Sequence, residues 1–451
     1  MAPVDETYLR EFYRGVQELP FLQPDNPYVV DFHPLLSSDE RIANDPVSYL
    51  VKDILWSASN RSLKMLSGFR GSGKTTELLR LRALLRAEGF RVLYINIEDY
   101  VEVNQPLDPT SFLISLVGAF EAAAHGRGGD PDDSGSTPGL TGPTTWWDRV
   151  RERLGKHPEF SGGSIDLGVA SIDIELRENP EFRAKVRRAI EGSLGSFRQE
   201  AHRHVADQVA ALRAAEPAGG EGGEGVVLIV DSLDHADNRS NFDELRNSIL
   251  ELFTAHSALL TLPAMHVIYT VPPYLKFMTA EGTDVRMLTT IKIINRDGSD
   301  FKPGIDALVE MVKRRAPNGD FERLLGSRQS LVGLIRDSGG HLRDLLRLLR
   351  EVCRTPYLAG LPVSEAEIAH ARANVRNTFL PLAESEKRWL RRVAAQHDAG
   401  LERDQDWGML AGLFDRHLIL GYVNGEEWYG AHPLVLDLLG SEGESGGTAA
   451  V

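Results

Sequence analysis

The sequence is poor in cysteine and contains no long apolar run. Its 451 residues include one cysteine, Cys353, which excludes a disulfide scaffold and a cysteine-based zinc site and fits a reducing cytosol. No stretch approaches the roughly 18 apolar residues of a membrane span, and the polar N-terminus is unlike a signal peptide. We therefore expect a cytoplasmic protein that does not interact with a membrane.

Positive charge is also scarce. Fifty lysines and arginines stand against 65 acidic residues, which gives a formal net charge of −15, and only ten of the cations are lysines. This balance opposes sequence-independent binding to nucleic acid, although it leaves room for a local basic face. The apolar fraction of 42% and the charged fraction of 25% are those of a globular chain long enough for several domains.

Short apolar runs alternate with helical patterns, which is typical of a parallel sheet with helical crossovers. Five runs predict strands over 63–67, 91–97, 225–231, 265–271 and 286–294. Helical patterns occupy 74–88 and 111–124. The sequence therefore predicts an α/β fold with a doubly wound sheet, in which ligands bind at the carboxyl ends of the strands.

A second helical pattern lies between two Gly-rich segments, 126–145 and 214–225. Apolar residues recur at every third or fourth position over 182–212, which predicts one long helix loosened near Gly192 and Gly195. Its apolar stripe either packs on its own domain or grips a partner chain.

Residues 68–75 match the phosphate-binding pattern GxxxxGK[ST] between a predicted strand and a predicted helix. Such glycines let backbone N–H groups face a phosphate, and the following helix adds a favourable dipole. Lys74 would reach the β- and γ-phosphates of ATP or ADP, and the Thr75 hydroxyl would hold Mg²⁺. The predicted nucleotide-binding residues here are Gly68, Phe69, Arg70, Gly71, Ser72, Gly73, Lys74, Thr75 and Thr76.

The apolar run 226–231 ends in Asp231, a Walker B pattern whose acid would bind the same metal ion. Most motor-type ATPases of this class carry glutamate at the next position, where this chain has Ser232. Asp234 and Glu98 are the candidates to activate the attacking water instead. The alternative for each is a solvated carboxylate at a strand end. We expect slow ATP hydrolysis.

Two further polar residues are candidates for sensing the nucleotide. Thr270, near the end of the strand 265–271, would contact the γ-phosphate or the attacking water, or else simply caps the strand. Arg343 follows Gly339-Gly340 at the start of a helix, after an amphipathic helix over 305–317, and would approach the nucleotide as a lid arginine. A surface arginine is the alternative.

The last third of the chain predicts three helices and a hairpin, whose turn is Asn424-Gly425. These elements predict a winged helix. Acidic side chains on its third helix and on the wing oppose a duplex-reading surface and favour a docking or regulatory role. They are Asp406, Asp415, Glu426 and Glu427. Elsewhere Trp146-Trp147 are predicted packing anchors, and Cys353 a core residue.

This order of motifs resembles the AAA+/STAND group of P-loop ATPases over about 45–125 and 225–440. The run 231–234 is similar to the STAND form of Walker B, and AHPLVLDL (431–438) is similar to the family's MHD motif. In that motif a winged-helix histidine, here His432, contacts the β-phosphate of ADP. Pro433 stands where the family has aspartate, and no arginine follows Thr270. Arg343 looks more like initiator-type members.

The motifs and the resemblance together imply a domain organisation. We predict an N-terminal extension, a P-loop ATPase domain with a helical insert, a helical lid, a winged-helix domain and a disordered tail, over 1–45, 46–300 (insert 126–224), 301–360, 361–440 and 441–451.

The resemblance implies a molecular switch of the kind found in bacterial defence or signalling systems. ADP would hold lid and winged helix against the P-loop, and ATP with Mg²⁺ would open them and permit homo-oligomer formation or partner binding. Effector and sensor proteins would act in trans. An arginine finger would come from Arg286, Arg314 or Arg315.

Two alternatives remain open. One is a DNA-associated ATPase of the initiator or transposition-regulator kind, which Arg343 and the winged helix favour and the net charge opposes. The other is a structural adaptor that binds through the helix at 180–212.

Overall fold

A computed structural model describes the parts of the chain from which the site is built. The described residues are 5–18, 22–35, 45–127, 145–160, 169–215, 224–235, 242–279, 284–355, 360–400, 406–424 and 426–440. The predicted tail 441–451, most of both Gly-rich segments and Gly425 of the predicted turn lie outside them.

The chain divides into two compact units, which alternate along the sequence. The first, called the sheet unit, consists of Pro46–Ser67 and Leu78–Met287. The second, called the lid unit, consists of Met1–Asp45, Gly68–Glu77 and Leu288–Val451. The phosphate-binding motif thus groups with the predicted lid. The domain boundaries drawn from the sequence stay a prediction.

The sheet has five strands in the order β2-β3-β4-β1-β5. They are β1 (Ser62–Gly68), β2 (Phe90–Asn96), β3 (Gly225–Asp231), β4 (His266–Val271) and β5 (Val285–Leu288). The pairs β1–β4, β2–β3 and β3–β4 are parallel, which confirms the α/β prediction. The fifth strand was predicted too long. Beyond Leu288 the backbone pairs elsewhere, because the Thr290 N–H donates to the Gly421 carbonyl at 2.9 Å.

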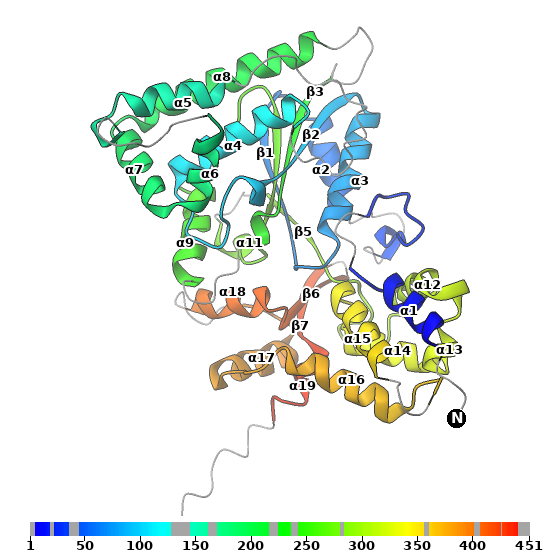
Figure 1. The fold of residues 1–451 in the computed structure, drawn as a ribbon. Helices are drawn as coiled ribbons and strands as arrows, with labels where there is room; N and C mark the ends of the chain where they lie inside the picture. Colours follow the sequence, from blue (N-terminus) through cyan, green and yellow to red (C-terminus); the bar gives the residue numbers. More distant parts are fainter. Residues whose placement is uncertain are drawn as a thin grey trace, which may run out of the picture. The chain divides into compact units, whose positions relative to one another are not determined.

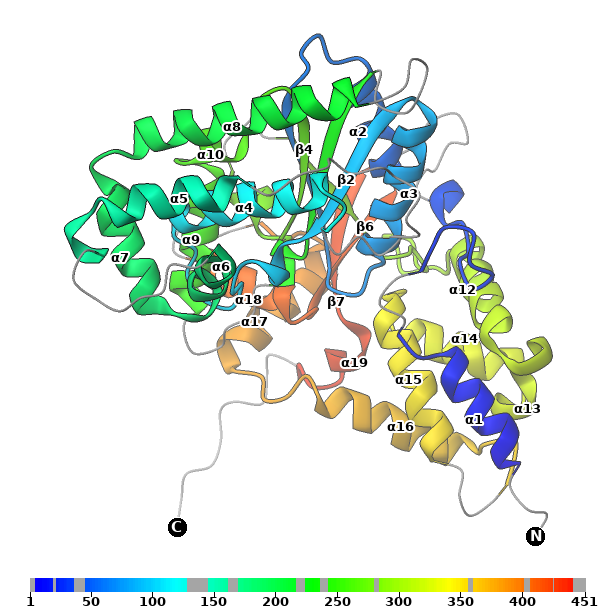
Figure 2. The same ribbon diagram turned by 45° about the horizontal axis from the view of Figure 1, so that its top comes forward.

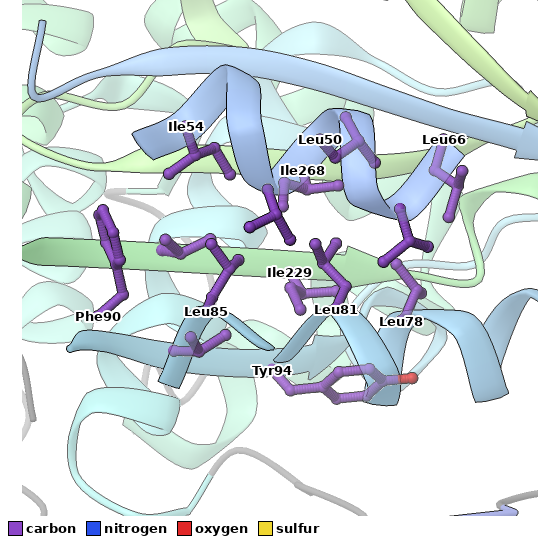
Figure 3. Packing of buried hydrophobic residues seen from close by; sticks show 14 residues of the cluster. Leu50, Ile54, Leu66, Leu78, Leu81, Leu85, Phe90, Tyr94, Ile229 and Ile268 are labelled. Atoms are coloured by element: carbon purple, nitrogen blue, oxygen red, sulfur yellow. The ribbon is translucent and has the colours of Figure 1, made fainter. Parts of the chain in front are cut away.

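Helices cover both faces of the sheet (Figures 1 and 2). On one face, α2 (Pro46–Leu55) and α3 (Lys74–Ala87) pack apolar side chains onto β1–β4. Figure 3 shows this core, in which Leu50 of α2 lies near Ile268 of β4 and Leu81 of α3 lies near Ile229 of β3. On the other face, α4 (Pro109–Ala124) contacts β2. The strand runs are largely apolar because most of their residues are buried on both faces of the sheet.

The segment between α4 and β3 is helical where it is described. It contains α5 (Trp146–Gly155), α6 (Val169–Glu178), α7 (Pro180–Glu191) and α8 (Leu194–Ala214). The single long helix predicted over 182–212 is therefore wrong, since the chain breaks at Gly192 and Ser193, where a residue without a Cβ ends α7.

The apolar stripe of α7 and α8 is buried within the sheet unit. Both helices contact α4, and Phe182, Phe197 and Val205 are buried. This favours packing on the same domain over an arm that grips a partner. The indole N–H of Trp146 donates to the Ile114 carbonyl at 2.9 Å, which confirms Trp146 as a packing anchor. The sheet unit also holds α9 (Phe242–Phe253), α10 (Ser257–Leu260) and α11 (Leu275–Met278).

The lid unit is mainly helical. Its helices are α1 (Glu6–Gly15), α12 (Lys302–Arg315), α13 (Glu322–Leu325), α14 (Arg328–Asp337), α15 (Leu342–Arg354), α16 (Glu365–Asn377), α17 (Glu384–Gln396), α18 (Trp407–Asp415) and α19 (Pro433–Leu436). An antiparallel hairpin, β6 (Ile419–Asn424) and β7 (Glu426–Ala431), follows α18. The predicted helix at 305–317, the three later helices and the hairpin are confirmed. Cys353 is buried on α15, as predicted.

Within the described ranges, no helix combines the length and the apolar character needed to cross a bilayer.

Candidate functional site

The phosphate-binding motif forms a tight loop between β1, which ends at Gly68, and α3, which begins at Lys74. Gly71 and Gly73 adopt φ values of 87° and 94°, a left-handed conformation that glycine reaches at little cost. The Lys74 ammonium is 6% exposed and donates to the carbonyls of Gly68 and Phe69, each at 2.7 Å. The loop thus concentrates a cation and the N-terminus of α3, as a phosphate site requires.

One hydroxyl of this loop lacks a partner. Ser72 Oγ is buried and makes no hydrogen bond to any residue that the structure describes. An unpaired buried hydroxyl costs free energy, which a phosphate oxygen would recover. The loop residues therefore fit the nucleotide that the sequence predicts.

Asp231 is the last residue of β3 and is 3% exposed. Its Oδ2 accepts from the Tyr94 hydroxyl at 2.5 Å, and its Oδ1 accepts from the Ser232 N–H at 2.7 Å. Ser232 has a φ of 74°, a left-handed conformation that costs a non-glycine residue about 1–3 kcal/mol. The carboxylate is therefore held in a fixed orientation, and carboxylate oxygens are ligands that Mg²⁺ prefers.

The candidates for water activation lie just beyond two strands. Asp234 is half-buried in a short 3₁₀ turn after β3, and Glu98 is half-buried in another after β2. Burial and the charge of Glu98 raise the pKa of the neighbouring Asp99. Thr270 is fully buried in β4, and its hydroxyl has no hydrogen-bond partner among the described residues. The catalytic roles of all three stay predictions.

Arg343 lies against the phosphate-binding loop, within the lid unit. A Cβ placed on Gly71 would lie 2.5 Å from the Cβ and 2.7 Å from the Nε of Arg343. The Nε also pairs with Glu18 of the N-terminal extension at 2.7 Å, and Glu18 pairs with Arg350 at 2.8 Å. The lid arginine is thus beside the loop. It also pairs with the carboxylate of Glu18, which the sequence did not predict.

A buried histidine links the lid to the loop backbone. His341 Nε2 lies 3.1 Å from the Arg70 carbonyl oxygen, and its Nδ1 lies 2.6 Å from Asp344 Oδ2. The two ring nitrogens thus join the loop backbone to the start of α15. Burial would raise the pKa of Asp344, but the charge and hydrogen bond of His341 and the contact with His432 hold it well below its usual range.

His432 is fully buried, and its Nε2 approaches Asp344 Oδ2 at 3.4 Å. Its Nδ1 accepts from the Leu434 N–H at 3.2 Å, and its ring lies 4.8 Å from the ring of Phe379. Its connection to the loop therefore runs through Asp344 and then His341. Contact with a β-phosphate stays a prediction.

His417, directly after α18, completes this cluster. Its ring centroid is 4.7 Å from that of His341. Burial, and then the neighbouring charge of His341, lower the pKa of His417 well below its ordinary value. His341, Asp344, His417 and His432 are called the His–Asp network below. His341, Asp344 and His417 lie close enough together to hold a metal ion, but the 2.6 Å contact between His341 and Asp344 is a direct hydrogen bond.

The loop also packs on the predicted wing domain. The ring of Phe69 lies 5.8 Å from that of Phe414 on α18. Tyr422 of β6 donates its hydroxyl to the Gly339 carbonyl at 2.7 Å, just before α15. Lid, wing and loop are therefore joined by both polar and apolar contacts.

The three arginine-finger candidates are all engaged within their own units. Arg315 is buried and donates to the Gly15 carbonyl at 3.0 Å. Arg314 donates to the Val29 carbonyl at 2.7 Å, and Arg286 pairs with Asp284 at 2.9 Å. This arrangement disfavours Arg315 in particular, since a buried guanidinium cannot reach another subunit.

Sequence reasoning missed His341, Asp344, Tyr94 and Glu18. The spacing of His341 and Asp344, one helical turn apart at a helix start, is the only local signal for the network, and it is a weak one. Tyr94 and Glu18 meet their partners through long-range contacts, which leave no local pattern.

No protein-family model matches the chain, and no curated protein matches its sequence. Among solved structures, it is similar to a Walker-type ATPase of Pyrococcus abyssi at 12% identity and a TM-score of 0.43, over 94% of this chain and 99% of that chain. It is also similar to Cdc6p from Pyrobaculum aerophilum at 12% identity and a TM-score of 0.32, over 88% of this chain and 91% of that chain. Both likenesses are remote, so the function has to be argued from the residues above.

Proposed function

We propose that the protein is a slow ATPase that works as a nucleotide-dependent switch. The supporting observation is the hydrogen bond from His341 to the Arg70 carbonyl, which ties the lid to the backbone of the phosphate-binding loop. A loop that changes its backbone on binding a nucleotide would strengthen or break this bond, and so move the lid.

The site residues keep the roles that the sequence gives them. Lys74 and the loop N–H groups bind the β- and γ-phosphates, and Thr75 with Asp231 holds Mg²⁺. Bound Mg²⁺ would neutralise charge on the phosphate oxygens. Asp234 or Glu98 orients the attacking water. Ser232 offers no carboxylate at the position next to Asp231, which fits slow turnover.

ATP and ADP must differ in their contacts for such a switch to work. Arg343 provides that difference, because it lies beside Gly71 while its guanidinium pairs with Glu18. A γ-phosphate would compete with Glu18 for Arg343, and ADP would not. Breaking that pair would loosen the N-terminal extension from α15, to which Glu18 would stay bound through Arg350. In the loosened state, effector and sensor proteins in trans, or further copies of the chain, would bind, as in defence or signalling systems.

The test compares sedimentation and limited proteolysis of the full chain with ATP and Mg²⁺ against ADP. We expect two distinct patterns for the wild type and one pattern for His341→Ala. His370→Ala is the matched control, since His370 is an exposed histidine on α16 of the same unit. Lys74→Ala should lose the nucleotide. If the wild type has the same size and the same cleavage pattern with both nucleotides, the proposed switch is contradicted.

The DNA-associated alternative gains no support from the wing, where Glu426 and Glu427 are exposed. It is tested by a gel shift with duplex DNA at increasing salt, because phosphate contacts weaken steeply as salt rises.

A further inference from the structure

The sheet unit contains a pocket that none of the motifs explains. It lies between the first half of α8, the end of α10 and the residue that precedes β1, and its volume is about 610 Å³. Figure 2 shows α8 and α10 as neighbours. This volume falls in the range of small-molecule sites, roughly 300–1,000 Å³.

Three arginines line this pocket, which is called the arginine pocket below. Arg198 and Arg203 come from α8, and Arg61 directly precedes β1. No carboxylate lines the pocket, and none of the three guanidinium groups has a carboxylate partner in the described part of the chain. In a protein with a net charge of −15, such a cluster of uncompensated cations is unusual.

Some other arginines of the same helical segment are paired. Arg153 forms an ion pair with Glu200 at 3.0 Å, and Arg151 pairs with Asp148 at 2.7 Å. Arg188 pairs with Glu159 at 3.1 Å. Acidic side chains are thus present in the same helical segment, but none of them pairs with the three arginines of the pocket.

The pKa of His202 shows the effect of the positive charge in the pocket. It lies one helical turn after Arg198 and also lines the pocket. Burial, and then the charges of Arg198 and Arg61, lower the pKa of His202. Its buried Nε2 has no hydrogen-bond partner among the described residues. The pocket thus offers positive potential and an unused polar atom.

We propose that the arginine pocket binds a small ligand that carries two or more phosphate groups. Guanidinium groups bind phosphate oxygens through two parallel hydrogen bonds, which gives both strength and orientation. The amide of Gln199 adds a neutral donor to the same lining. The Thr261 hydroxyl also lines the pocket, but it donates to the Ser257 carbonyl at 3.2 Å. No phenylalanine, tyrosine or tryptophan lines the pocket, and the three arginines are its charged groups. Recognition would therefore rest mainly on the phosphates.

A long nucleic acid fits the same observations less well. The rest of the chain is strongly acidic and would repel a polyanion that extends beyond the pocket.

The arginine pocket is distinct from the phosphate-binding loop. Arg61 precedes β1 and the loop follows it, and no residue of the loop lines the pocket. The ligand of the pocket is therefore a different molecule from the nucleotide proposed for the loop.

The test is calorimetric titration of inorganic pyrophosphate into the Lys74→Ala full chain, which removes the lysine of the loop. We expect one equivalent to bind. Adding Arg198→Gln and Arg203→Gln should weaken binding at least about tenfold, because two charge-assisted contacts are lost. Adding Arg151→Gln and Arg188→Gln, which makes the same change in net charge outside the pocket, should leave it unchanged.

The outcomes separate this proposal from the switch. Unchanged pyrophosphate binding in the Arg198/Arg203 variant, or no pyrophosphate binding by the Lys74→Ala protein, would contradict the proposed phosphate site in the pocket. Neither result depends on whether the loop binds a nucleotide. Binding of a single-stranded oligonucleotide that depends on Arg198 and Arg203, without pyrophosphate binding, would also overturn it and assign a nucleic-acid surface. Slower hydrogen exchange in α8 on adding pyrophosphate would support the pocket independently of affinity.

Discussion

Two clusters of charged and titratable side chains lie in different units of this protein, and they treat charge in opposite ways. In the His–Asp network, His341 and Asp344 are buried, and each meets partners within the lid unit. In the arginine pocket, three guanidinium groups face an open space of about 610 Å³ without a carboxylate among the described residues.

The difference shows what each cluster is suited to do. Buried charges persist only when they are paired, and a paired cluster fixes geometry at the cost of desolvation. Uncompensated charges persist only where water or a ligand can reach them. The network therefore suits the positioning of the lid, and the pocket suits the binding of an anion. Substitutions in the two places should have opposite consequences for stability.

The largest effect is expected at Asp344. Replacing it with alanine leaves His341 buried without its carboxylate, and removing one member of a buried pair typically costs about 3–5 kcal/mol of unfolding free energy. Urea denaturation of Asp344→Ala measures this loss. Asp344→Asn keeps a polar partner and should lose less. A loss below about 1 kcal/mol for the alanine variant would mean that the network is not charge-paired.

A smaller loss is expected from crowding the loop next to the network. Gly71→Ala and Gly73→Ala both force a left-handed φ on alanine, at about 1–2 kcal/mol each. Only Gly71 also faces the Cβ of Arg343 at 2.5 Å, whereas the nearest atom to a Cβ on Gly73 lies 3.8 Å away. Overpacking should add roughly 1–3 kcal/mol to Gly71→Ala.

The measurements are the unfolding free energy of the nucleotide-free protein and the protease sensitivity of its lid. Gly73→Ala is the matched control for Gly71→Ala. Equal losses in the two variants would show that Arg343 does not rest on the loop.

The pH dependence of stability isolates His417. Its folded pKa is lowered, so below the unfolded value of about 6.5 only the unfolded chain takes up the proton, and stability falls as pH decreases. His341, Asp344, Arg343 and Lys74 contribute charge at this position. Between pH 7.5 and 5.5, His417 should account for a loss of about 1 kcal/mol in the free energy of unfolding.

The measurement is the unfolding free energy at several pH values for the wild type and His417→Gln. His202 and His266 also have lowered pKa values and contribute the same sign in both proteins. The variant should therefore show a shallower slope, and parallel slopes would contradict a neutral buried His417.

Much of the fold follows from local sequence patterns. The runs of β1–β4 are largely apolar because most of their residues are buried, so length and composition locate them. The predicted end of β5 was wrong, because the true end depends on Thr290 pairing with Gly421, far along the chain. The sequence did not predict the break between α7 and α8, because the apolar period continues across Gly192.

The candidate site divides in the same way. The loop at 68–75 and the strand that ends in Asp231 are local motifs, so sequence places them. The His–Asp network and the arginine pocket are made by residues that meet only in the folded chain, as Arg61 meets Arg198. No periodicity records such meetings, and the sequence therefore left both unpredicted.

The smallest effect is expected at Arg198, and its sign is the most informative. Arg198→Gln removes a like charge from the neighbourhood of Arg61 and Arg203, so unfolding free energy should stay within about 0.5 kcal/mol of the wild type or rise slightly. Arg153→Gln, on a paired arginine, should instead cost up to about 1 kcal/mol through the lost ion pair with Glu200. Any gain at Arg198 should shrink as salt screens the repulsion. A loss above about 1 kcal/mol at Arg198 would mean that the pocket, like the network, is a structural cluster whose partners hold the fold together.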